Sequence, residues 1–144
     1  MNAALTIVRE FAAPREKVWR MWTEPEYFSI WFGTDEVPIA LESVSMDVRV
    51  GGTWRATMDL PDEFQIHWAG EYTEVEPPAH LGFTMTDEPG QPAGDPVVVE
   101  LLAVPGGTQM TLTQSTPDFT EEQYAATIIG YNGFFDSMQA LLED

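Results

Sequence analysis

Polar side chains in the apolar phase of a predicted strand or helix are the first candidates for chemistry in this sequence. Gln114 follows Met110 and Leu112 at two-residue steps, so it falls on the inward face of a predicted strand. Tyr72 also falls on the inward face of a strand, and Tyr131 falls on the apolar face of the last helix. A buried polar group needs a hydrogen-bond partner, which is either a bound ligand or the backbone at the end of a sheet. The sequence leaves both interpretations open for Gln114, Tyr72 and Tyr131.

Other ionisable residues fit a structural role better. Glu100 joins the inward set only if the even-numbered residues of Val97 to Val104 point inward, and that stretch is too apolar for its phase to be assigned. His67 falls in the outward phase and is expected to be a solvated strand residue. His80 follows two prolines and is expected in a loop.

No set of residues has the pattern of a catalytic or metal centre. Asp47 and Arg49 share the outward phase with Arg55, which predicts cross-strand charge pairs rather than acid–base chemistry. We find no nucleophile–base–orienter set and no paired inward carboxylates. The absence of cysteine excludes thiolate nucleophiles and cysteine-ligated zinc, and the two separated histidines argue against a histidine-rich metal site. Lys17, the single candidate for Schiff-base chemistry, lies in a surface-like helical stretch. We therefore predict no catalytic residues, no metal and no cofactor.

Charge is the most unusual global property of the chain. There are 24 Asp and Glu residues against six Lys and Arg, for a formal net charge of −18. Such a field repels phosphate backbones and anionic lipid, so nucleic acid and membrane surfaces are poor partners. The acidic residues are spread out, which favours a solvated surface over a disordered acidic tail or a site for a basic partner. No apolar run approaches the ~18 residues of a membrane span, and the N-terminus lacks a signal-peptide pattern. A cytoplasmic protein is expected.

The first part of the chain predicts a strand followed by two short helices. Leu5 to Phe11 is rich in β-formers, Pro14 suits a first helical turn, and a second helical piece covers Glu26 to Trp31. The second piece and its flank hold the densest aromatic cluster in the chain. These aromatics either pack as a satellite core beneath the corner between the two helices or lie exposed around Trp31 and Phe32, where they would serve a homodimer interface or a pocket entrance.

From about Leu41 the apolar residues recur with period two, which predicts consecutive antiparallel strands. The first of these strands is expected to reach Val50 and to turn at Gly51-Gly52. Phe64 continues the inward phase of the strand after the next turn. The run Asp87 to Pro96, rich in proline and glycine, is predicted as a loop.

The chain ends in one long amphipathic helix, roughly from Asp118 to Leu142. Asp118 or Thr120 can cap its start. About 25 residues at 1.5 Å each make a rod of roughly 35 Å, which must lie across another element. Apolar residues at steps of three and four form one face, and such a face is typical of core packing. They are Tyr124, Ile128, Tyr131, Phe135, Met138 and Leu142.

The order of elements predicts an α+β domain that spans residues 1–144. A curled antiparallel sheet of about six to seven strands would carry two short helices and hold the long C-terminal helix across its concave face. If the helix and the sheet do not fully interdigitate, a cavity remains between them.

The same order resembles the START-like, or polyketide-cyclase-like (SRPBCC), superfamily of helix-grip folds. Within that superfamily, the sequence is most similar to the group named after the activator of the heat-shock-protein ATPase. Each motif is weak alone, but five in the right order support the fold. One position departs from the pattern, because many relatives carry Gly-Trp where this chain has Gly130-Tyr131. The matching segments are Ala13-Pro14-Arg15-Glu16-x-Val18-Trp19, Thr23-Glu24-Pro25-Glu26 with Trp31-Phe32-Gly33, Asp47-x-Arg49-x-Gly51-Gly52-x-Trp54-Arg55, Gly70-x-Tyr72-x-Glu74-x-x-Pro77-Pro78-x-x-Leu81, and Thr111-x-Thr113.

The resemblance implies a cavity between helix and sheet that binds a small, mostly hydrophobic molecule, as a carrier, sensor or stress-related binding protein. Flat aromatic faces and flexible thioethers suit varied apolar ligands, although they suit an ordinary core equally well. The part of the helix between Ile128 and Phe135, where Gly130 and Gly133 leave gaps, is expected to face the ligand. The predicted wall consists of Trp54, Met58, Trp68, Tyr72, Phe83, Met85, Met110, Gln114, Ile128, Tyr131 and Phe135.

Two other functions stay open at this stage. Some relatives catalyse cyclisation or hydrolysis in the same cavity, so a cyclase- or hydrolase-like enzyme is the first alternative. A co-chaperone that regulates a chaperone ATPase is the second, and it rests on analogy of fold and family name alone.

Overall fold

The protein is described by a computed structural model that covers residues 4–33, 38–86, 95–116 and 119–143. Its fold is α+β, as the sequence predicts. The strands are β1 (Ala4–Phe11), β2 (Ser45–Met46), β3 (Thr53–Asp59), β4 (Gln65–Glu76), β5 (His80–Phe83), β6 (Val97–Val104) and β7 (Gly107–Ser115). The helices are α1 (Arg15–Thr23), α2 (Pro25–Trp31) and α3 (Glu121–Glu143), with short 3-10 turns η1 (Leu41–Ser43) and η2 (Pro61–Glu63).

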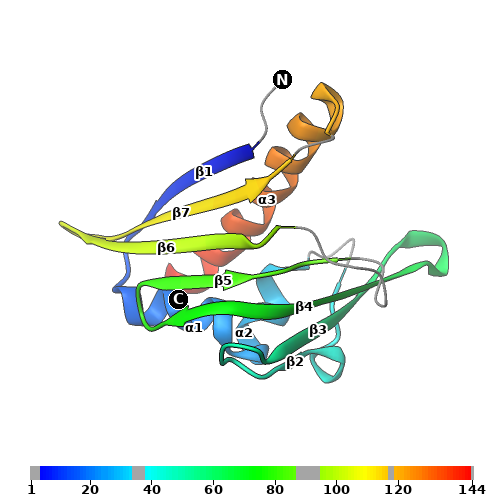
Figure 1. The fold of residues 1–144 in the computed structure, drawn as a ribbon, viewed down its shortest axis with the longest axis horizontal. Coiled ribbons are helices and arrows are strands. Elements are labelled where there is room, and N and C mark those ends of the chain that lie inside the picture. Colours follow the sequence, from blue (N-terminus) through cyan, green and yellow to red (C-terminus); the bar gives the residue numbers. More distant parts are fainter. Residues whose placement is uncertain (1–3, 34–37, 87–94, 117–118, 144) are drawn as a thin grey trace.

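One antiparallel sheet holds all seven strands in the order β1-β7-β6-β5-β4-β3-β2 (Figure 1). The first strand thus pairs with the last, which brings the N-terminal segment beside the C-terminal hairpin. All three helices lie behind the sheet in the view of Figure 1, so they cover one face and leave the other to solvent. This arrangement is the helix-grip fold expected from the sequence.

The two short helices begin and end where the sequence predicts. Pro14 lies just before α1, and Pro25 opens α2. Val18, Met21 and Trp22 form the buried stripe of α1, as one face of a helix requires. Trp31 and Phe32 are buried rather than exposed, because their rings join the rings of Trp22, Phe28 and Trp54 in the core. Of the two alternatives for this cluster, the packed core beneath the helix corner is therefore confirmed, and exposed aromatics at Trp31 and Phe32 are wrong.

The predicted strand from Leu41 to Val50 is much shorter in the structure. Only Ser45 and Met46 pair with β3, and Leu41–Ser43 forms a 3-10 turn instead. After Met46 the chain closes on itself, since Gly52 N–H donates to the Arg49 carbonyl at 2.8 Å. Any side chain at Gly52 would collide with the Asp47 carbonyl, because an ideal Cβ would lie 2.0 Å from that oxygen. Alternation of apolar residues therefore continues into a turn, and pairing with the sheet resumes at Gly51 and Gly52, which exchange hydrogen bonds with Tyr72 of β4.

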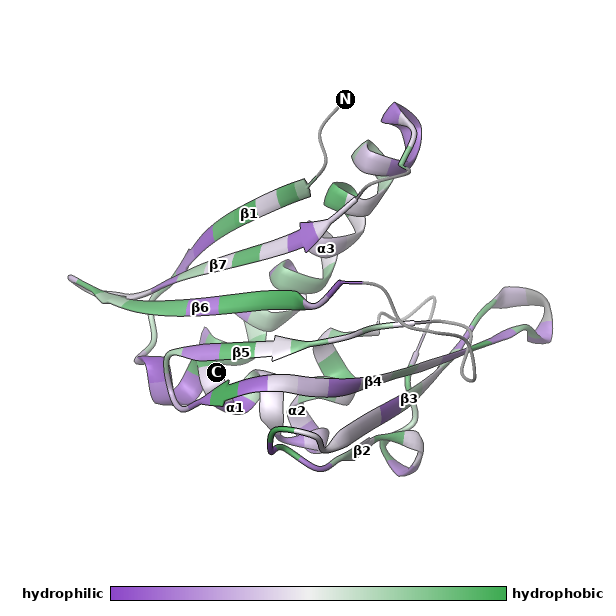
Figure 2. Cartoon of the chain, viewed as in Figure 1, coloured by the Kyte–Doolittle hydropathy of each residue, from purple (hydrophilic) through white to green (hydrophobic). Residues whose placement is uncertain are grey.

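Several outward and inward assignments are corrected by the sheet register. Phe64, expected inside, is 71% exposed at the turn before β4. The odd-numbered residues of β6 point inward, so Glu100 is exposed on the outer face of the sheet. There its Oε1 lies 4.0 Å from His80 Nδ1. His80 begins β5 rather than lying in a loop, and it contacts Glu74 as well. β6 is apolar along most of its length (Figure 2), which is why its phase was ambiguous.

The outward phase of the β3–β4 pair agrees with prediction in most respects. His67 lies opposite Thr57, and its Nδ1 is 3.2 Å from the Thr57 hydroxyl. Asp47 and Arg49 do pair, at 2.8 Å, but within the turn rather than across two strands. Asp118 and the segment 87–94 of the predicted loop lie outside the described residues.

A reciprocal pair of hydrogen bonds caps the start of α3. Gln123 N–H donates to the Thr120 hydroxyl at 3.1 Å, and Thr120 N–H donates to the Gln123 side-chain oxygen at 2.9 Å. This is a capping box, which satisfies two backbone donors that a helix leaves without partners. Thr120 is therefore a cap, as the sequence allowed. No helix among the described residues is long and apolar enough to cross a bilayer.

Candidate functional site

The long helix α3 packs unevenly along its length. Tyr131, Phe135, Met138 and Leu142 are buried, whereas Tyr124 and Ile128 nearer its start are only partly buried. All of the predicted apolar face therefore points at the sheet, but only its second half is enclosed. The first half of α3 lies over the sheet less closely and leaves space beside it.

A cleft of about 540 Å³ occupies that space. It lies between the first half of α3, the end of α2 and the ends of β4 and β7. Half of its ten lining residues are aromatic, and none carries a formal charge at neutral pH. The lining residues are Phe32, Trp68, Met85, Thr86, Gln114, Phe119, Thr127, Gly130, Tyr131 and Phe134.

Gln114 and Tyr131 form the polar pair of this cleft. The Tyr131 hydroxyl donates to Gln114 Oε1 in a hydrogen bond that joins α3 to β7. Gln114 occupies the position opposite Leu5 of β1, on the inner face of the sheet. The Tyr131 ring stacks on Phe135 with 5.8 Å between ring centroids, which holds the hydroxyl in place. Burial raises the pKa of Tyr131 well above its ordinary value, so the hydroxyl stays neutral.

Gly130 gives the cleft part of its width. An ideal Cβ built at Gly130 meets nothing within 4 Å, so any larger side chain there would extend into open space. Gly133, three residues later, is equally open but does not line the cleft. Of the two glycines expected to face a ligand, Gly130 alone borders the site.

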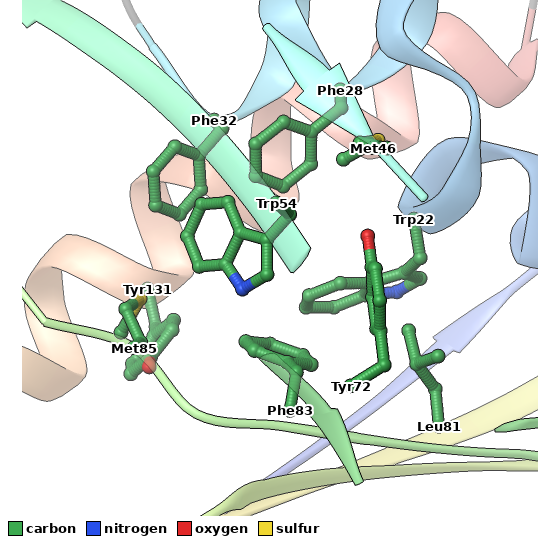
Figure 3. A pocket seen from close by; sticks show the side chains of 10 residues that line it. All are labelled: Trp22, Phe28, Phe32, Met46, Trp54, Tyr72, Leu81, Phe83, Met85 and Tyr131. Atoms are coloured by element: carbon green, nitrogen blue, oxygen red, sulfur yellow. The ribbon is translucent and has the colours of Figure 1, made fainter. Parts of the chain in front are cut away.

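A second, smaller void lies between α1, α2 and strands β2 to β5 (Figure 3). It holds only about 10 Å³, which is roughly the room that one water molecule needs. Phe32, Met85 and Tyr131 line both the void and the cleft, so these side chains form the wall between the two. The remaining lining residues of the void are Trp22, Phe28, Met46, Trp54, Tyr72, Leu81 and Phe83.

The predicted wall residues divide into four groups. Trp54, Tyr72 and Phe83 line the smaller void, and Trp68 and Gln114 line the cleft. Met85 and Tyr131 line both. The structure does not bring the other four, Met58, Met110, Ile128 and Phe135, to either space. A ligand-binding role for the whole set stays a prediction.

The four residues that line neither space have packing contacts of their own. Met110 is fully buried, and its sulfur accepts a hydrogen bond from Trp22 Nε1 at 3.3 Å. Phe135 is also fully buried, between Tyr131 and the tryptophans of α1 and α2. Met58 is 4% exposed, and Ile128 packs on the edge of the core. These side chains fill the contact between helix and sheet.

Sequence reasoning missed part of the cleft wall. Phe134 and Thr127 lie on the flank of α3 rather than on its central apolar face, and they belong to the series 127, 130, 131 and 134 at steps of three, one and three. Such spacing marks a strip beside the buried stripe of a helix. The glycine in this strip was the available signal, because it removes a side chain from a flank that otherwise carries Thr127 and Phe134.

The described residues contain no group of three or more His, Asp or Glu side chains arranged to hold a metal ion. One residue of the cleft wall, Trp68, has a buried polar atom. Trp68 Nε1 has no hydrogen-bond partner, although it is sealed from solvent. The cleft therefore combines aromatic walls, one neutral hydrogen-bonding pair and no charge, which suits binding of an apolar molecule better than proton transfer or metal chemistry.

The family model for "Activator of Hsp90 ATPase homolog 1-like protein" matches residues 12–143. The chain belongs to this family. Its fold places it in the START-like (SRPBCC) superfamily, which confirms the resemblance found in the sequence. The family and the fold together suggest a ligand-binding or co-chaperone-like function. No curated protein matches the sequence significantly.

Solved structures share the fold over nearly the whole chain. An AHSA1-like protein from Aeromonas hydrophila is 26% identical, with 97% of this chain and 92% of that chain covered and a TM-score of 0.80. A protein from Nitrosomonas europaea is 25% identical over 99% of this chain and 97% of its own, with a TM-score of 0.81. A protein from Chromobacterium violaceum is 23% identical, with 100% of this chain and 99% of that chain covered and a TM-score of 0.84. At this identity the similarity supports the fold alone.

Proposed function

We propose that the protein binds a small, mostly hydrophobic molecule in the cleft beside the first half of α3, as a carrier or sensor. The observation that carries this proposal is an uncharged cleft of about 540 Å³ with aromatic walls. Ligand sites in proteins have volumes of about 300–1,000 Å³, apolar walls and a few placed polar groups. The Gln114–Tyr131 pair supplies the polar groups in this cleft.

Aromatic packing keeps the cleft from collapsing. Phe32 lies 5.9 Å from Trp68 and 5.2 Å from Phe134, measured between ring centroids, so rings from α2, β4 and α3 support one another around the opening. Rigid rings present apolar area at low cost in conformational entropy. A preformed site of this kind gains affinity because little has to be ordered when the ligand binds.

The first test is binding of Nile red, a neutral fluorophore that brightens in apolar sites. We expect saturable binding to the wild type and at least a tenfold weaker affinity for Gly130→Leu, because the new side chain fills the cleft. Gly133→Leu is the matched control, since it makes the same change on the same helix outside the cleft. No saturable binding to the wild type, or equal loss in both variants, would contradict the proposal.

A co-chaperone role is a second candidate, favoured by the family description alone. It predicts that the protein changes the ATPase rate of an Hsp90-type chaperone in a titration. A flat titration would exclude that role without affecting the binding proposal.

A further inference from the structure

Among the described residues, the hydrogen-bonding capacity of the Gln114–Tyr131 pair is only partly used. The Tyr131 O–H donates to Gln114 Oε1, which leaves the two N–H donors of the Gln114 carboxamide and the lone pairs of the Tyr131 oxygen. Among the described residues, no hydrogen bond is made by Gln114 Nε2, and this atom is not sealed from solvent. The pair therefore offers the cleft one donor and one acceptor side by side.

The pair presents one free donor and one free acceptor whichever way the Gln114 carboxamide is oriented. If Nε2 donates to the Tyr131 oxygen instead, the Tyr131 O–H becomes the free donor and Gln114 Oε1 becomes the free acceptor. In either arrangement a ligand group that both donates and accepts completes the set, and a hydroxyl group is the smallest neutral group that does so.

Charge in and around the cleft disfavours an anionic ligand. No Lys, Arg or His lines the cleft, and the chain has a formal net charge of −18. A carboxylate would offer acceptors only, would face the Tyr131 oxygen, and would lose its hydration without gaining a cation. Burial raises the pKa of Tyr131, so the pair itself stays neutral over the physiological range.

A cationic ligand would be attracted by the aromatic walls of the cleft but would not complete the hydrogen bonds of the Gln114–Tyr131 pair. Aromatic faces attract ammonium groups, and five of the ten lining residues are aromatic. An ammonium group, however, only donates, so the free N–H groups of Gln114 would stay unpaired in a partly buried site, which weakens binding.

We propose that the cleft selects an apolar molecule that carries a neutral hydroxyl group, and that Gln114 and Tyr131 hold that hydroxyl. A phenol fits best, because the rings of Phe32, Trp68 and Phe134 provide flat surfaces for an aromatic body. This inference rests on the proposed binding function and specifies the chemical class of the ligand.

The test uses four probes with one skeleton, each measured by displacement of Nile red at neutral pH. They are 2-methylnaphthalene, 2-naphthol, 2-naphthoate and 2-naphthylmethylammonium. Two neutral hydrogen bonds together favour 2-naphthol over 2-methylnaphthalene by about tenfold in wild-type affinity. The two charged probes are expected to bind more weakly than 2-naphthol.

Two variants assign that preference to the pair. Tyr131→Phe and Gln114→Leu should each bring the affinity ratio of 2-naphthol to 2-methylnaphthalene close to one, with the affinity for 2-methylnaphthalene retained. Gln109→Leu, on the same strand but away from the cleft, should keep the wild-type ratio. Melting curves establish that each variant is folded, and either cleft variant alone is sufficient for the test.

The outcomes separate the two proposals. Binding of Nile red with equal displacement by 2-naphthol and 2-methylnaphthalene would overturn the hydroxyl inference and leave the binding function standing. Preference for 2-naphthoate or for the ammonium probe would also overturn it, as would a preference for 2-naphthol that both variants retain. Failure of the wild type to bind Nile red or any of the four probes would defeat the binding function, and the inference with it.

Discussion

At the scale of single residues, two tryptophans on the inner face of the sheet differ in one hydrogen bond. Trp54 Nε1 donates to the Thr84 carbonyl at 3.0 Å, whereas Trp68 Nε1 is buried without a partner. Gly70, which pairs with Trp54 across β3 and β4, makes room for the first bond, because a Cβ there would lie 2.4 Å from Trp54 Nε1.

Replacement by phenylalanine should destabilise the protein more at Trp54 than at Trp68. Trp54→Phe strands the Thr84 carbonyl and loses packing, whereas Trp68→Phe loses packing but removes an unpaired donor. A buried group left without its partner costs about 1–3 kcal/mol, so we expect Trp54→Phe to reduce the free energy of unfolding by about 2 kcal/mol more than Trp68→Phe. Urea titrations measure both values. Equal losses would mean that Trp68 Nε1 has a partner in solution.

Two buried tyrosines predict a loss of stability at alkaline pH. Burial raises the pKa of Tyr72 and of Tyr131, and the Asp47 carboxylate adds to the effect at Tyr72. The folded state holds both phenol protons more tightly than the unfolded chain does, where the pKa is about 10. Their contribution is therefore complete below that pH and is lost as pH rises above it.

The measurement is the melting temperature as a function of pH from about 8 to 11. We expect a fall above pH ~10 in the wild type, and a shallower fall in the double variant Tyr72→Phe/Tyr131→Phe. Other titrating groups are common to both proteins, so the difference isolates the two phenols. Parallel curves would contradict this prediction.

At the scale of elements, Arg9 links α3 to β1, the edge strand of the sheet, through hydrogen bonds. The Arg9 guanidinium, on β1, donates to Asn132 Oδ1 at 3.2 Å, to Asp136 Oδ1 at 3.0 Å and to Gln139 Oε1 at 3.1 Å. These three residues follow one flank of α3, and the cleft lies along the opposite flank. Lys17, expected at the surface, instead donates to the Leu142 carbonyl at 3.0 Å near the end of the helix, where a cation suits the helix dipole.

Removal of the Arg9 contacts should loosen α3 as a unit. The side chain of Arg9 is 19% exposed and that of Asp136 is 73% exposed, so solvent screens the pair. We expect Arg9→Met to reduce the free energy of unfolding by about 1 kcal/mol and to speed amide exchange across α3. Arg49→Met breaks a more exposed pair in a turn and is the control, with an expected change within about 0.5 kcal/mol. Unchanged exchange in α3 would argue that apolar packing alone holds the helix.

The same scale explains what the sequence could predict. The sequence predicted β1 and α2 to within one residue at each end, because both have clear signals where they begin and end. The stretch before Gly51-Gly52 kept a period of two but became a turn, in which Arg49 N–H donates to the Asp47 carbonyl and Gly52 N–H donates to the Arg49 carbonyl. Position along a strand does not reveal where pairing stops, and the exposed Phe64 at the end of a hairpin is a second example.

At the scale of the whole molecule, the cleft results from unequal packing of α3, and apart from Gly130 no local pattern in the sequence marks it. Met110 and Phe135 were predicted as ligand contacts on the same grounds as Tyr131, yet they lie in the filled half of the interface. Which half is filled depends on α1 and α2, whose aromatic rings occupy the space beneath the second half of the helix. Gln114 was found from sequence because a polar residue in an apolar phase is unusual wherever the helix lies.

The net charge makes a final prediction for the molecule as a whole. With 24 acidic and six basic residues, the folded chain gathers like charges into a smaller volume than the unfolded chain does. Salt screens this repulsion, since the Debye length falls from about 30 Å at 0.01 M to about 3 Å at 1 M ionic strength. We therefore expect the melting temperature to rise by several degrees between these two ionic strengths. A gain of about 1 kcal/mol in the free energy of unfolding corresponds to roughly 2–4 °C for a domain of this size.

Sodium chloride and potassium chloride should act equally, because screening depends on ionic strength alone. A melting temperature that falls with salt would mean that ion pairs such as Arg9–Asp136 outweigh the net repulsion.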